Sequence, residues 1–572
     1  MPRITQPVLF FVLFLLPLNW PAYEANAQDS QRPKKLIATG WDHVDPQRLA
    51  ANLQDMEGRP FDGVVIRIAG QTPEGRSVPL QWAFQKDRWE QAWFQESVET
   101  LRQVRSDKLT DNFVLLNANP GNVDWFDDEG WTAVVEHCRI AAWCAKQSGA
   151  KGILFDPEPY APPNAAFHYG AQPQREEHSF GQYYEQARLR GRQMMQAVAG
   201  EYPEITLFCY FMNSVVASAT GQADPRSALK SSHYGLYPAL IDGWLDAAPS
   251  TATFVDGCES AYRYNSTEQY LESAVAIKGA CQELVSPENR AKHRAQVQVS
   301  FGIYLDAYWN PKDSEWGTWY IDGLGRPRVE RLRTNTATAL RVADEYVWVY
   351  GEKFRWWPTP NGRVRQETWP EALAGCDKVL SYVRDPVEYA RRELADLEQN
   401  GELPNLLANG EFTSETAATA DGKQVPWSPG RPPAGWSAWQ EADSKGDFTW
   451  DREVGLGAAG SARASGVAGG CFLQGCPAAP GDRFAVRSHV RTEGRSDVWI
   501  RVRWQTDESK WTAETKDRIF MPQASAGPWR EILGVVEVPE GAGRLVVLLG
   551  VAGQAGAEDV AWFDNVLLYR LP

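Results

Sequence analysis

Two carboxylates stand two residues apart where an apolar run ends, in the segment GILFDPEPYAPP. They are Asp156 and Glu158, and a proline follows each of them directly. Residues two apart on an extended chain point to the same side, and two steps of about 3.3 Å separate their α-carbons by roughly 6–7 Å. Proline cannot donate to a strand ladder and restricts the backbone, so we expect both acids to be held in place beyond the last paired residue.

Paired carboxylates of this kind are suited to proton transfer. A glutamate near a second carboxylate, shielded from water by aromatic rings, holds its proton more tightly than usual, which suits a general acid. Tyr160 supplies such a ring two residues beyond Glu158. The alternative is that Asp-Pro and Glu-Pro form only a polar turn between a strand and a helix. Two acids on one face beside a ring favour catalysis.

The elements around this segment predict a barrel. Between residues 35 and 395, eight apolar runs alternate with amphipathic helical segments. Runs that are apolar throughout are typical of strands buried on both faces, hence of a parallel sheet. Eight strand–helix units close most naturally into a (β/α)8 TIM barrel, whose active sites lie at the C-terminal ends of the strands. The predicted strands are 35–41, 63–68, 113–119, 152–156, 205–211, 251–257, 297–306 and 346–352.

Several other predicted strands also end in acids and aromatic residues. A salt bridge or a solvated loop would explain any single acid, but their recurrence at one end of a barrel favours a binding cleft. We expect Glu259 or Glu352 to be the second catalytic carboxylate, acting as nucleophile or base. The residues expected to bind substrate are Trp41, Asp42, Asn117, Asn119, Tyr160, Asp256, Tyr262, Asp306, Tyr308, Trp348, Tyr350 and Trp356.

Composition narrows the class of ligand. The formal net charge is -15, which argues against nucleic acid or an anionic membrane surface, because both attract a positive face. The chain contains 25 Trp, 20 Tyr and 22 Phe. Rings beside carboxylates suit a carbohydrate, whose C–H face packs on a ring while its hydroxyls bond to acids. Scattered histidines and the absence of a Cys-x-x-Cys pair give no zinc signature, so we expect no cofactor for catalysis.

The N-terminus predicts export. Residues 1–27 combine Arg3, an apolar core over 8–18 and an A-x-A site at 25–27, as in a signal peptide that is cleaved near Ala27. The mature protein is then secreted or periplasmic. No later run approaches the roughly 18 apolar residues of a membrane span, so no integral membrane segment is expected. Cys471 and Cys476 either close a short disulfide loop or remain reduced. The sequence gives no indication of oligomeric state.

The residue pattern of the chain changes after the predicted barrel domain, 28–395. A linker over 396–404 leads into 405–572, where short alternating runs are separated by glycine and proline turns. Such a pattern is typical of an all-β sandwich. The chain is therefore expected to contain two domains.

At Asp156 and Glu158 the chain resembles barrel-type glycoside hydrolases, and in particular the end of the family eighteen chitinase motif D-x-x-D-x-D-x-E. In that family the glutamate is the acid and the adjacent aspartate supports a substrate N-acetyl group, which implies these roles for Glu158 and Asp156. The two earlier aspartates of the motif are replaced by Leu154 and Lys151, so the match is partial and does not extend to chitinase activity. The tryptophan-bearing eighth strand is similar to the aromatic floor in many such barrels.

The C-terminal domain resembles jelly-roll carbohydrate-binding modules, in NLLANGEF at its start and AWFDNVLLYR at its end. Such modules often hold a structural Ca²⁺ with acids near both ends, which implies that Glu411 and Asp564 lie near an ion. Oxygen ligands of this kind are what Ca²⁺ prefers. The alternative is a sandwich that binds nothing. Candidate sugar platforms are Trp436, Trp439, Trp450, Trp504 and Trp511.

Two main interpretations follow. The first is a secreted glycoside hydrolase in which Glu158 protonates the leaving oxygen and Asp156 tunes it or acts as nucleophile. Carboxyl groups about 5 Å apart would retain the anomeric configuration, and about 6.5–9.5 Å would invert it. The second is a non-catalytic carbohydrate-binding protein on a barrel scaffold. An opposing carboxylate favours the enzyme, whereas a cation that neutralises Glu158, such as Lys353 or Arg355, favours the binding protein.

A lyase or an esterase is a third class. The sequence contains no G-x-S-x-G elbow, which argues against an esterase of the α/β-hydrolase type. The neighbouring His233 and Tyr234 have side chains that can move protons in an elimination. Neither class explains the recurrence of acids at the predicted strand ends.

Overall fold

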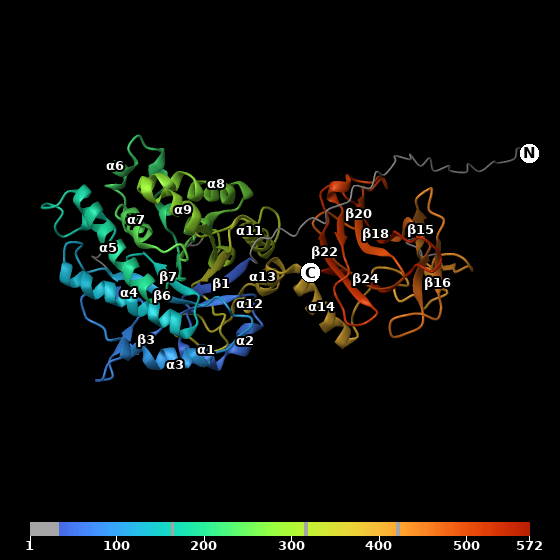
Figure 1. Ribbon diagram of the computed structural model, residues 1–572, viewed down its shortest axis with the longest axis horizontal. Helices are drawn as coiled ribbons and strands as arrows, with labels where there is room; N and C mark the ends of the chain where they lie inside the picture. The colour runs from blue at the N-terminus through green and yellow to red at the C-terminus, as the bar shows by residue number, and fades with distance from the viewer. Residues whose placement is uncertain (1–33, 162–164, 314–317, 419–423, 572) are drawn as a thin grey trace, which may run out of the picture. The chain divides into compact units, whose positions relative to one another are not determined.

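The chain folds into two compact units, residues 1–368 and 369–572. The computed structural model describes residues 34–161, 165–313, 318–418 and 424–571 (Figure 1). The predicted signal peptide over 1–27, with its cleavage site near Ala27, lies outside the described residues.

The first unit contains a nearly closed barrel of parallel strands. Their spatial order is β10-β9-β8-β7-β6-β2-β1-β12-β11, and β5 (Trp82–Phe84) pairs with β6 outside this path. All neighbours on the path are parallel. The strands are β1 (Lys35–Gly40), β2 (Gly63–Ile66), β6 (Phe113–Pro120), β7 (Gly152–Asp156), β8 (Thr206–Cys209), β9 (Thr253–Asp256), β10 (Val297–Val299), β11 (Phe301–Tyr304) and β12 (Tyr346–Gly351).

Each of the eight predicted runs contains a strand, and one run contains two. The predicted seventh strand is interrupted at Ser300, so that β10 pairs with β9 while β11 pairs with β12. The backbone N–H of Ser300 donates to the carbonyl of Asp256 at 2.9 Å. Strands β2, β7 and β8 are buried along their whole length, as the uninterrupted apolar runs predict.

Helices lie outside the strands of the first unit (Figure 1). The longer ones carry recognisable end signals: α4 begins after Asp127, whose side chain accepts from Gly130 N–H, and ends at Gly149 in the left-handed region, as helix caps require. None of the helices in the described parts of the chain is long and apolar enough to cross a membrane. The helices are α1 (Pro46–Ala51), α2 (Leu53–Glu57), α3 (Gln95–Gln103), α4 (Asp128–Ser148), α5 (Phe180–Glu201), α6 (Pro225–Leu229), α7 (Tyr237–Ala247), α8 (Thr267–Lys278), α9 (Arg290–Gln296), α10 (Leu305–Trp309) and α11 (Arg328–Val342).

The second unit contains two five-stranded antiparallel sheets, ordered β15-β18-β23-β20-β21 and β16-β17-β24-β19-β22. Buried side chains from both sheets, among them Phe472 and Phe563, form a single core, as in a sandwich. The strands are β15 (Ser437–Gln440), β16 (Asp447–Asp451), β17 (Ser461–Ser465), β18 (Gly469–Pro477), β19 (Arg483–Glu493), β20 (Asp497–Gln505), β21 (Arg518–Phe520), β22 (Arg530–Glu537), β23 (Arg544–Ala552) and β24 (Val560–Leu571).

The second unit begins earlier than the sequence predicts. It contains α12 (Trp369–Ala372), α13 (Cys376–Arg384) and α14 (Pro386–Asn400), whereas the predicted barrel domain runs to residue 395 and the predicted linker covers 396–404. The reason is the apolar face of α14, because Ala390 and Leu394 pack against a cluster on the second sheet. The other buried members of that cluster are Ala485, Leu533, Leu567 and Leu571.

The structure decides between the two alternatives for Cys471 and Cys476, since all eight cysteines are free. Both lie on one continuous strand, β18, where five steps span about 16 Å, too far for a disulfide. Three of the five proposed platforms, Trp436, Trp450 and Trp504, are buried in the core. Trp439 and Trp511 are 40% and 48% exposed.

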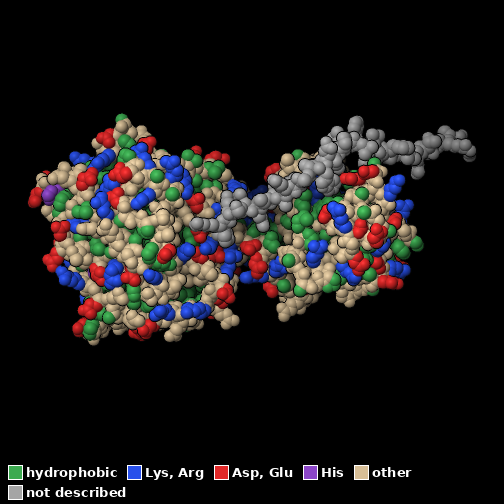
Figure 2. Space-filling model, viewed as in Figure 1, with side chains coloured by type: hydrophobic (Ala, Val, Ile, Leu, Met, Phe, Trp, Pro, Cys, Tyr) green, Lys and Arg blue, Asp and Glu red, His purple; other side chains and the backbone are tan. Residues whose placement is uncertain are grey.

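On the face shown in Figure 2, Lys and Arg side chains are interspersed with Asp and Glu on each unit, without an extended patch of one sign. This face therefore presents no extended basic field of the kind that attracts a polyanion.

Candidate active site

Carboxylates from the ends of three barrel strands form one cluster. Asp156 is the last residue of β7, with Glu158 two residues on, Glu259 begins the 3-10 helix η4 (Glu259–Arg263) after β9, and Glu352 follows β12. Burial raises the pKa of Glu259 to about 9, with further contributions from the charges of Glu158, Asp156 and Glu352. The charges of these three acids therefore act on Glu259. These four residues are called the acid cluster below.

Asp156 and Glu158, the two acids at the end of the fourth predicted strand, interact with each other. Asp156 is 4% exposed, and burial followed by the charge of Glu158 raises its pKa to about 8. Its Oδ1 accepts from the backbone N–H of Glu158 at 3.0 Å. Burial also raises the pKa of Glu158, while the hydrogen bond from Tyr160 lowers it. That hydrogen bond runs from the Tyr160 hydroxyl to Oε2 of Glu158 at 2.6 Å.

Glu352 is positioned by a buried aspartate. Oδ2 of Asp306 accepts from the Glu352 backbone N–H at 2.8 Å, and Nζ of Lys353 lies 3.6 Å from Oδ1 of Asp306. Burial and then the charge of Asp306 raise the pKa of Glu352 to about 7, whereas a hydrogen bond from Tyr304 and the charge of Lys353 lower it. Because Asp306 is fully buried, its carboxylate anchors the strand end instead of facing solvent.

Aromatic rings pack around the acid cluster. Trp348 is fully buried and its Nε1 donates to the Gly257 carbonyl at 2.8 Å. Tyr210 stacks on Trp348 with ring centroids 4.5 Å apart, and Tyr262 lies 5.2 Å from the same indole. The pKa of Tyr350 is raised by burial and by neighbours that include Tyr210 and acids of the cluster. Trp348, Tyr262 and Tyr350, predicted as substrate-binding residues, thus gather beside the carboxylates.

The two predicted asparagines support the segment that carries Glu158. Asn119, which is 1% exposed, donates from Nδ2 to the Glu158 carbonyl at 2.6 Å and accepts at Oδ1 from the Tyr160 N–H at 2.8 Å. Oδ1 of Asn117 accepts from the Asn119 N–H at 3.2 Å. The polar atoms of Asn119 therefore bond to the protein itself, so it acts as a clamp on this loop.

Two other predicted residues, Asp256 and Asp42, also anchor loops. Asp256 is buried and accepts from the backbone of Met212 (3.0 Å), Ser214 (3.0 Å) and Cys258 (3.2 Å). Asp42 forms an ion pair with Arg48 at 2.7 Å. Its carboxylate also accepts from the backbone N–H groups of Trp356 and Trp357, at 3.0 and 3.1 Å. These bonds occupy both carboxylates, so their roles in the fold are structural.

The remaining residues predicted to bind substrate do not lie together. Tyr308 is buried and its hydroxyl accepts from Asn335 Nδ2 at 2.9 Å, and Trp356 is buried edge-on against Phe61 with centroids 4.9 Å apart. Both are packing residues. Trp41 is 48% exposed, and its backbone N–H donates to the carbonyl of Gly351, the residue before Glu352. An exposed ring therefore stands next to the strand end that carries one acid of the cluster.

Three tyrosines near the acid cluster were missed by sequence reasoning. Tyr304 bonds to Glu352. Tyr210 bonds to the Thr39 hydroxyl at 2.7 Å. Burial and the charges of Glu158 and Glu259 raise the pKa of Tyr234, a residue noted only for an elimination. Tyr304 precedes Asp306 by two residues in one apolar run, so strand alternation contained a signal for it.

The predicted calcium ligands affect each other electrostatically. Burial is the largest cause of a pKa of about 7 for Asp564, and the charge of Glu411 contributes to this increase. Both oxygens of Asp564 already accept backbone bonds, from Leu456 at 2.6 Å and Asn565 at 2.7 Å. Within the described ranges, no group of three His, Cys, Asp or Glu side chains could hold a metal ion. A calcium ion here would need backbone oxygens as well, and it remains a prediction.

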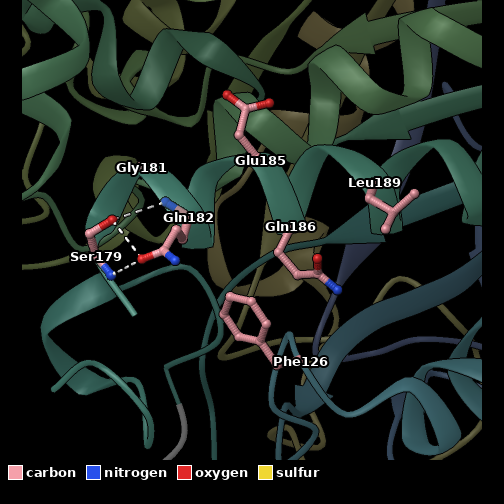
Figure 3. A pocket seen from close by; sticks show the side chains of 7 residues that line it. All are labelled: Phe126, Ser179, Gly181, Gln182, Glu185, Gln186 and Leu189. Carbon is pink, nitrogen blue, oxygen red and sulfur yellow. Dashed lines mark hydrogen bonds between the residues drawn. The ribbon is translucent and has the colours of Figure 1, made fainter. Parts of the chain in front are cut away.

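A separate hollow lies along the first turns of α5, away from the predicted catalytic residues (Figure 3). Ser179 caps this helix: its backbone N–H donates to Gln182 Oε1 at 2.8 Å. The lining is uncharged except for Glu185, and none of the acid cluster contributes to it. Its residues are Phe126, Ser179, Gly181, Gln182, Glu185, Gln186 and Leu189.

Comparison with known proteins gives only distant similarities. No family model matches the chain, and no curated protein matches it. Among solved structures, the enzymatically active domain of tailspike protein 4 from bacteriophage CBA120 is 17% identical, with a TM-score of 0.22, over 29% of this chain and 21% of that one. The CBM22-1–GH10 modules of a Clostridium thermocellum endo-1,4-beta-D-xylanase are 14% identical, with a TM-score of 0.20, over 24% and 26% of the two chains.

A third solved structure is TmCBM61 in complex with beta-1,4-galactotriose, 13% identical with a TM-score of 0.20. That match covers 29% of this chain and 99% of the other. This chain spans about a fifth and a quarter of the first two proteins. TM-scores this low establish neither a shared fold nor a shared activity, so the function has to be argued from the site itself.

Proposed function

We propose that the protein is a secreted or periplasmic glycoside hydrolase with its active site at the acid cluster. In this proposal the first unit is a (β/α)8 TIM barrel in which β10 and β11 together form the seventh strand. The observation that carries the proposal is the convergence of four carboxylates from the ends of β7, β9 and β12. Strand ends of this kind hold the catalytic residues of TIM-barrel enzymes.

Glu158 acts as the general acid, and Glu259 or Glu352 acts as the second catalytic carboxylate. The buried environment of Glu158 raises its pKa, as an acid that must carry a proton near neutral pH requires. The charge of Glu158 in turn raises the pKa of Glu259, which supports a short separation between the two. Asp156 adjusts the pKa of Glu158, and Glu352 adds to the negative charge of the site. Glycoside hydrolysis uses such pairs to protonate the leaving oxygen and to stabilise or attack the sugar.

The neighbours of Glu158 favour an enzyme over a non-catalytic binding protein. The discriminating feature is whether a cation or a carboxylate opposes Glu158. Nζ of Lys353 lies 3.6 Å from Asp306, and the Arg355 guanidinium donates to the Pro358 carbonyl at 2.9 Å. The charge of Glu158 instead raises the pKa values of Asp156 and Glu259, and its bonded partner is the Tyr160 hydroxyl. This arrangement supports proton transfer at Glu158.

We further propose that the second unit is a jelly-roll domain of the carbohydrate-binding-module type. Its exposed Trp439 and Trp511 are large flat apolar surfaces of the kind on which sugar rings pack. We expect Trp439→Ala and Trp511→Ala to weaken the binding of the full chain to an insoluble polysaccharide.

The test of the enzyme proposal is release of reducing sugar from a panel of polysaccharides and aryl glycosides, comparing wild type with Glu158→Gln. The variant keeps the shape of the side chain and is expected to lose about 100-fold or more in kcat on at least one substrate while still binding it. Glu272→Gln, an exposed glutamate on α8, is the matched control. Binding without turnover by either protein would overturn the enzyme proposal in favour of a binding protein.

A further inference from the structure

Tyr160 is bonded to the proposed general acid through one particular oxygen. Its hydroxyl donates to Oε2 of Glu158 at 2.6 Å, which leaves Oε1 outside this bond. The ring is 53% exposed, whereas Glu158 is half-buried. The two carboxyl oxygens of Glu158 are therefore not equivalent, because one of them already accepts a hydrogen bond from the protein.

Side chains, and not the strand ladder, hold this contact in place. The last register pair between β6 and β7 joins Asn117 to Asp156, and the prolines that follow cannot donate to a ladder. Beyond that pair, Asp156 accepts from the Glu158 N–H. Nδ2 of Asn119 donates to the Glu158 carbonyl at 2.6 Å, and Oδ1 of Asn119 accepts from the Tyr160 N–H at 2.8 Å. The buried Asn119 side chain is thus hydrogen-bonded to the backbone on both sides of Pro159.

We propose that Tyr160, held by Asn119, is a positioning residue that places the transferable proton of Glu158 on Oε1. The inference rests on the proposed function. With Oε2 accepting from Tyr160, protonated Glu158 carries its hydrogen on Oε1, the oxygen left for substrate. Without the tyrosine hydroxyl both oxygens are equivalent acceptors, and part of the population carries its proton on the wrong one.

The same hydrogen bond assists proton release. As the O–H bond at Oε1 breaks, the proton passes to the glycosidic oxygen, and the carbon–oxygen bond cleaves with its electron pair going to that oxygen. The anomeric carbon receives a new electron pair from water or from the second catalytic carboxylate. Glu158 is left as a carboxylate. The bond from Tyr160 then has an ionised acceptor and becomes stronger, since charge-assisted hydrogen bonds exceed neutral ones. Tyr160 therefore stabilises the acid more after it has donated its proton than before.

The test combines a direct titration of Glu158 with a pH profile. The Glu158 carboxyl is followed by carbon-13 NMR in the full chain labelled at glutamate, with Glu158→Gln supplying the assignment. In Tyr160→Phe we expect its pKa to rise by about one unit, because the variant loses a hydrogen bond that favours the ionised carboxylate. The alkaline limb of the kcat profile should move upward equally, with kcat down roughly tenfold and KM nearly unchanged.

Two further variants make the result specific. Asn119→Ala releases the clamp and should shift the Glu158 titration in the same direction as Tyr160→Phe. Tyr202→Phe is the matched control and removes a hydroxyl that donates to the Ala150 carbonyl at 3.3 Å. Ala150 precedes β7, whereas Glu158 follows it. This variant should therefore change neither the Glu158 titration nor the pH profile. Circular dichroism and the melting temperature check that each variant is folded.

Two outcomes would overturn the inference: an unchanged Glu158 titration in folded Tyr160→Phe, or a shift of the acidic limb in place of the alkaline one. The second would make Glu158 the ionised partner and not the proton donor. The titration needs no substrate, so it stays readable if the chain hydrolyses nothing. Failure of the proposed function and failure of this inference are thus separate results.

Discussion

At the scale of single residues, the acid cluster is a group of carboxyl groups whose pKa values are all raised. Burial is the largest cause for Asp156, Glu158, Glu259 and Glu352, and the charges of neighbouring acids add to it for all but Glu158. Hydrogen bonds from tyrosines oppose it at Glu158 and Glu352. Within the described chain no hydrogen bond to the Glu259 carboxylate is formed, which fits its strongly raised pKa.

These raised pKa values predict that the first unit loses stability as pH increases. The folded-state pKa is about 8 for Asp156 and about 9 for Glu259, whereas both ionise near pH 4 in the unfolded chain. Between about pH 4 and 9 the unfolded state releases protons that the folded state keeps, so the unfolding free energy falls, by at most about 1.4 kcal/mol per pH unit for each group. Calorimetric melting temperatures measured from pH 5 to 9 check the slope.

Glu259→Gln should flatten that slope, because it removes one of the raised groups and keeps the shape of the side chain. Glu272→Gln on the exposed face of α8 should leave the slope as in wild type. A melting temperature of the first unit that stays level or increases from pH 5 to 9 would contradict the electrostatic description of the cluster.

At the scale of elements, the strand ends are set by tight contacts between backbone and rings. Gly257, at the end of β9, lies against Trp348, whose Nε1 donates to its carbonyl at 2.8 Å. Gly302 in β11 lies under two rings, since an added Cβ would be 2.6 Å from Tyr262 and 2.7 Å from Trp348. Because glycine has no Cβ, the rings can approach the backbone closely at these two positions beside the acid cluster.

Gly302→Ala is therefore expected to destabilise the first unit by about 1–3 kcal/mol, since overpacking forces rings and backbone apart. Activity should fall with it, because Tyr262 and Trp348 pack beside the acids. Gly200→Ala is the matched control: this glycine lies in α5 with open space around it, so alanine should be neutral or stabilising by up to about 1 kcal/mol. Denaturant unfolding of both variants measures the difference, and equal stabilities would show that the rings can move aside.

At the scale of the whole molecule, the chain consists of two units with separate cores, and α14 belongs to the second. Ala390 and Leu394 on this helix pack on the outer face of the second sheet, against residues such as Leu533 and Leu567. A helix that supplies buried apolar surface to a sheet contributes to the stability of that unit.

Leu394→Ala is expected to lower the stability of the second unit by about 2–5 kcal/mol, since Leu394 is 1% exposed and its removal leaves a cavity. Scanning calorimetry of the full chain should show one transition moving down while that of the first unit stays in place. Asp396→Ala, an exposed position on the same helix, should move neither. A shift of the first unit's transition alone would mean that α14 stabilises the barrel instead.

The sequence by itself determined the local pattern. Uninterrupted apolar runs predict the buried parallel strands, and the alternation of side chains on an extended chain predicts that Asp156 and Glu158 share a face. The tertiary structure decided which acids meet: Glu259 and Glu352 join Asp156 and Glu158, whereas Asp42, Asp256 and Asp306 become loop anchors. It also assigned α14 to the second unit. The physical reason is that the partners of these groups lie far along the chain, as with Asp42 and Trp356, 314 residues apart, and barrel closure brings them together.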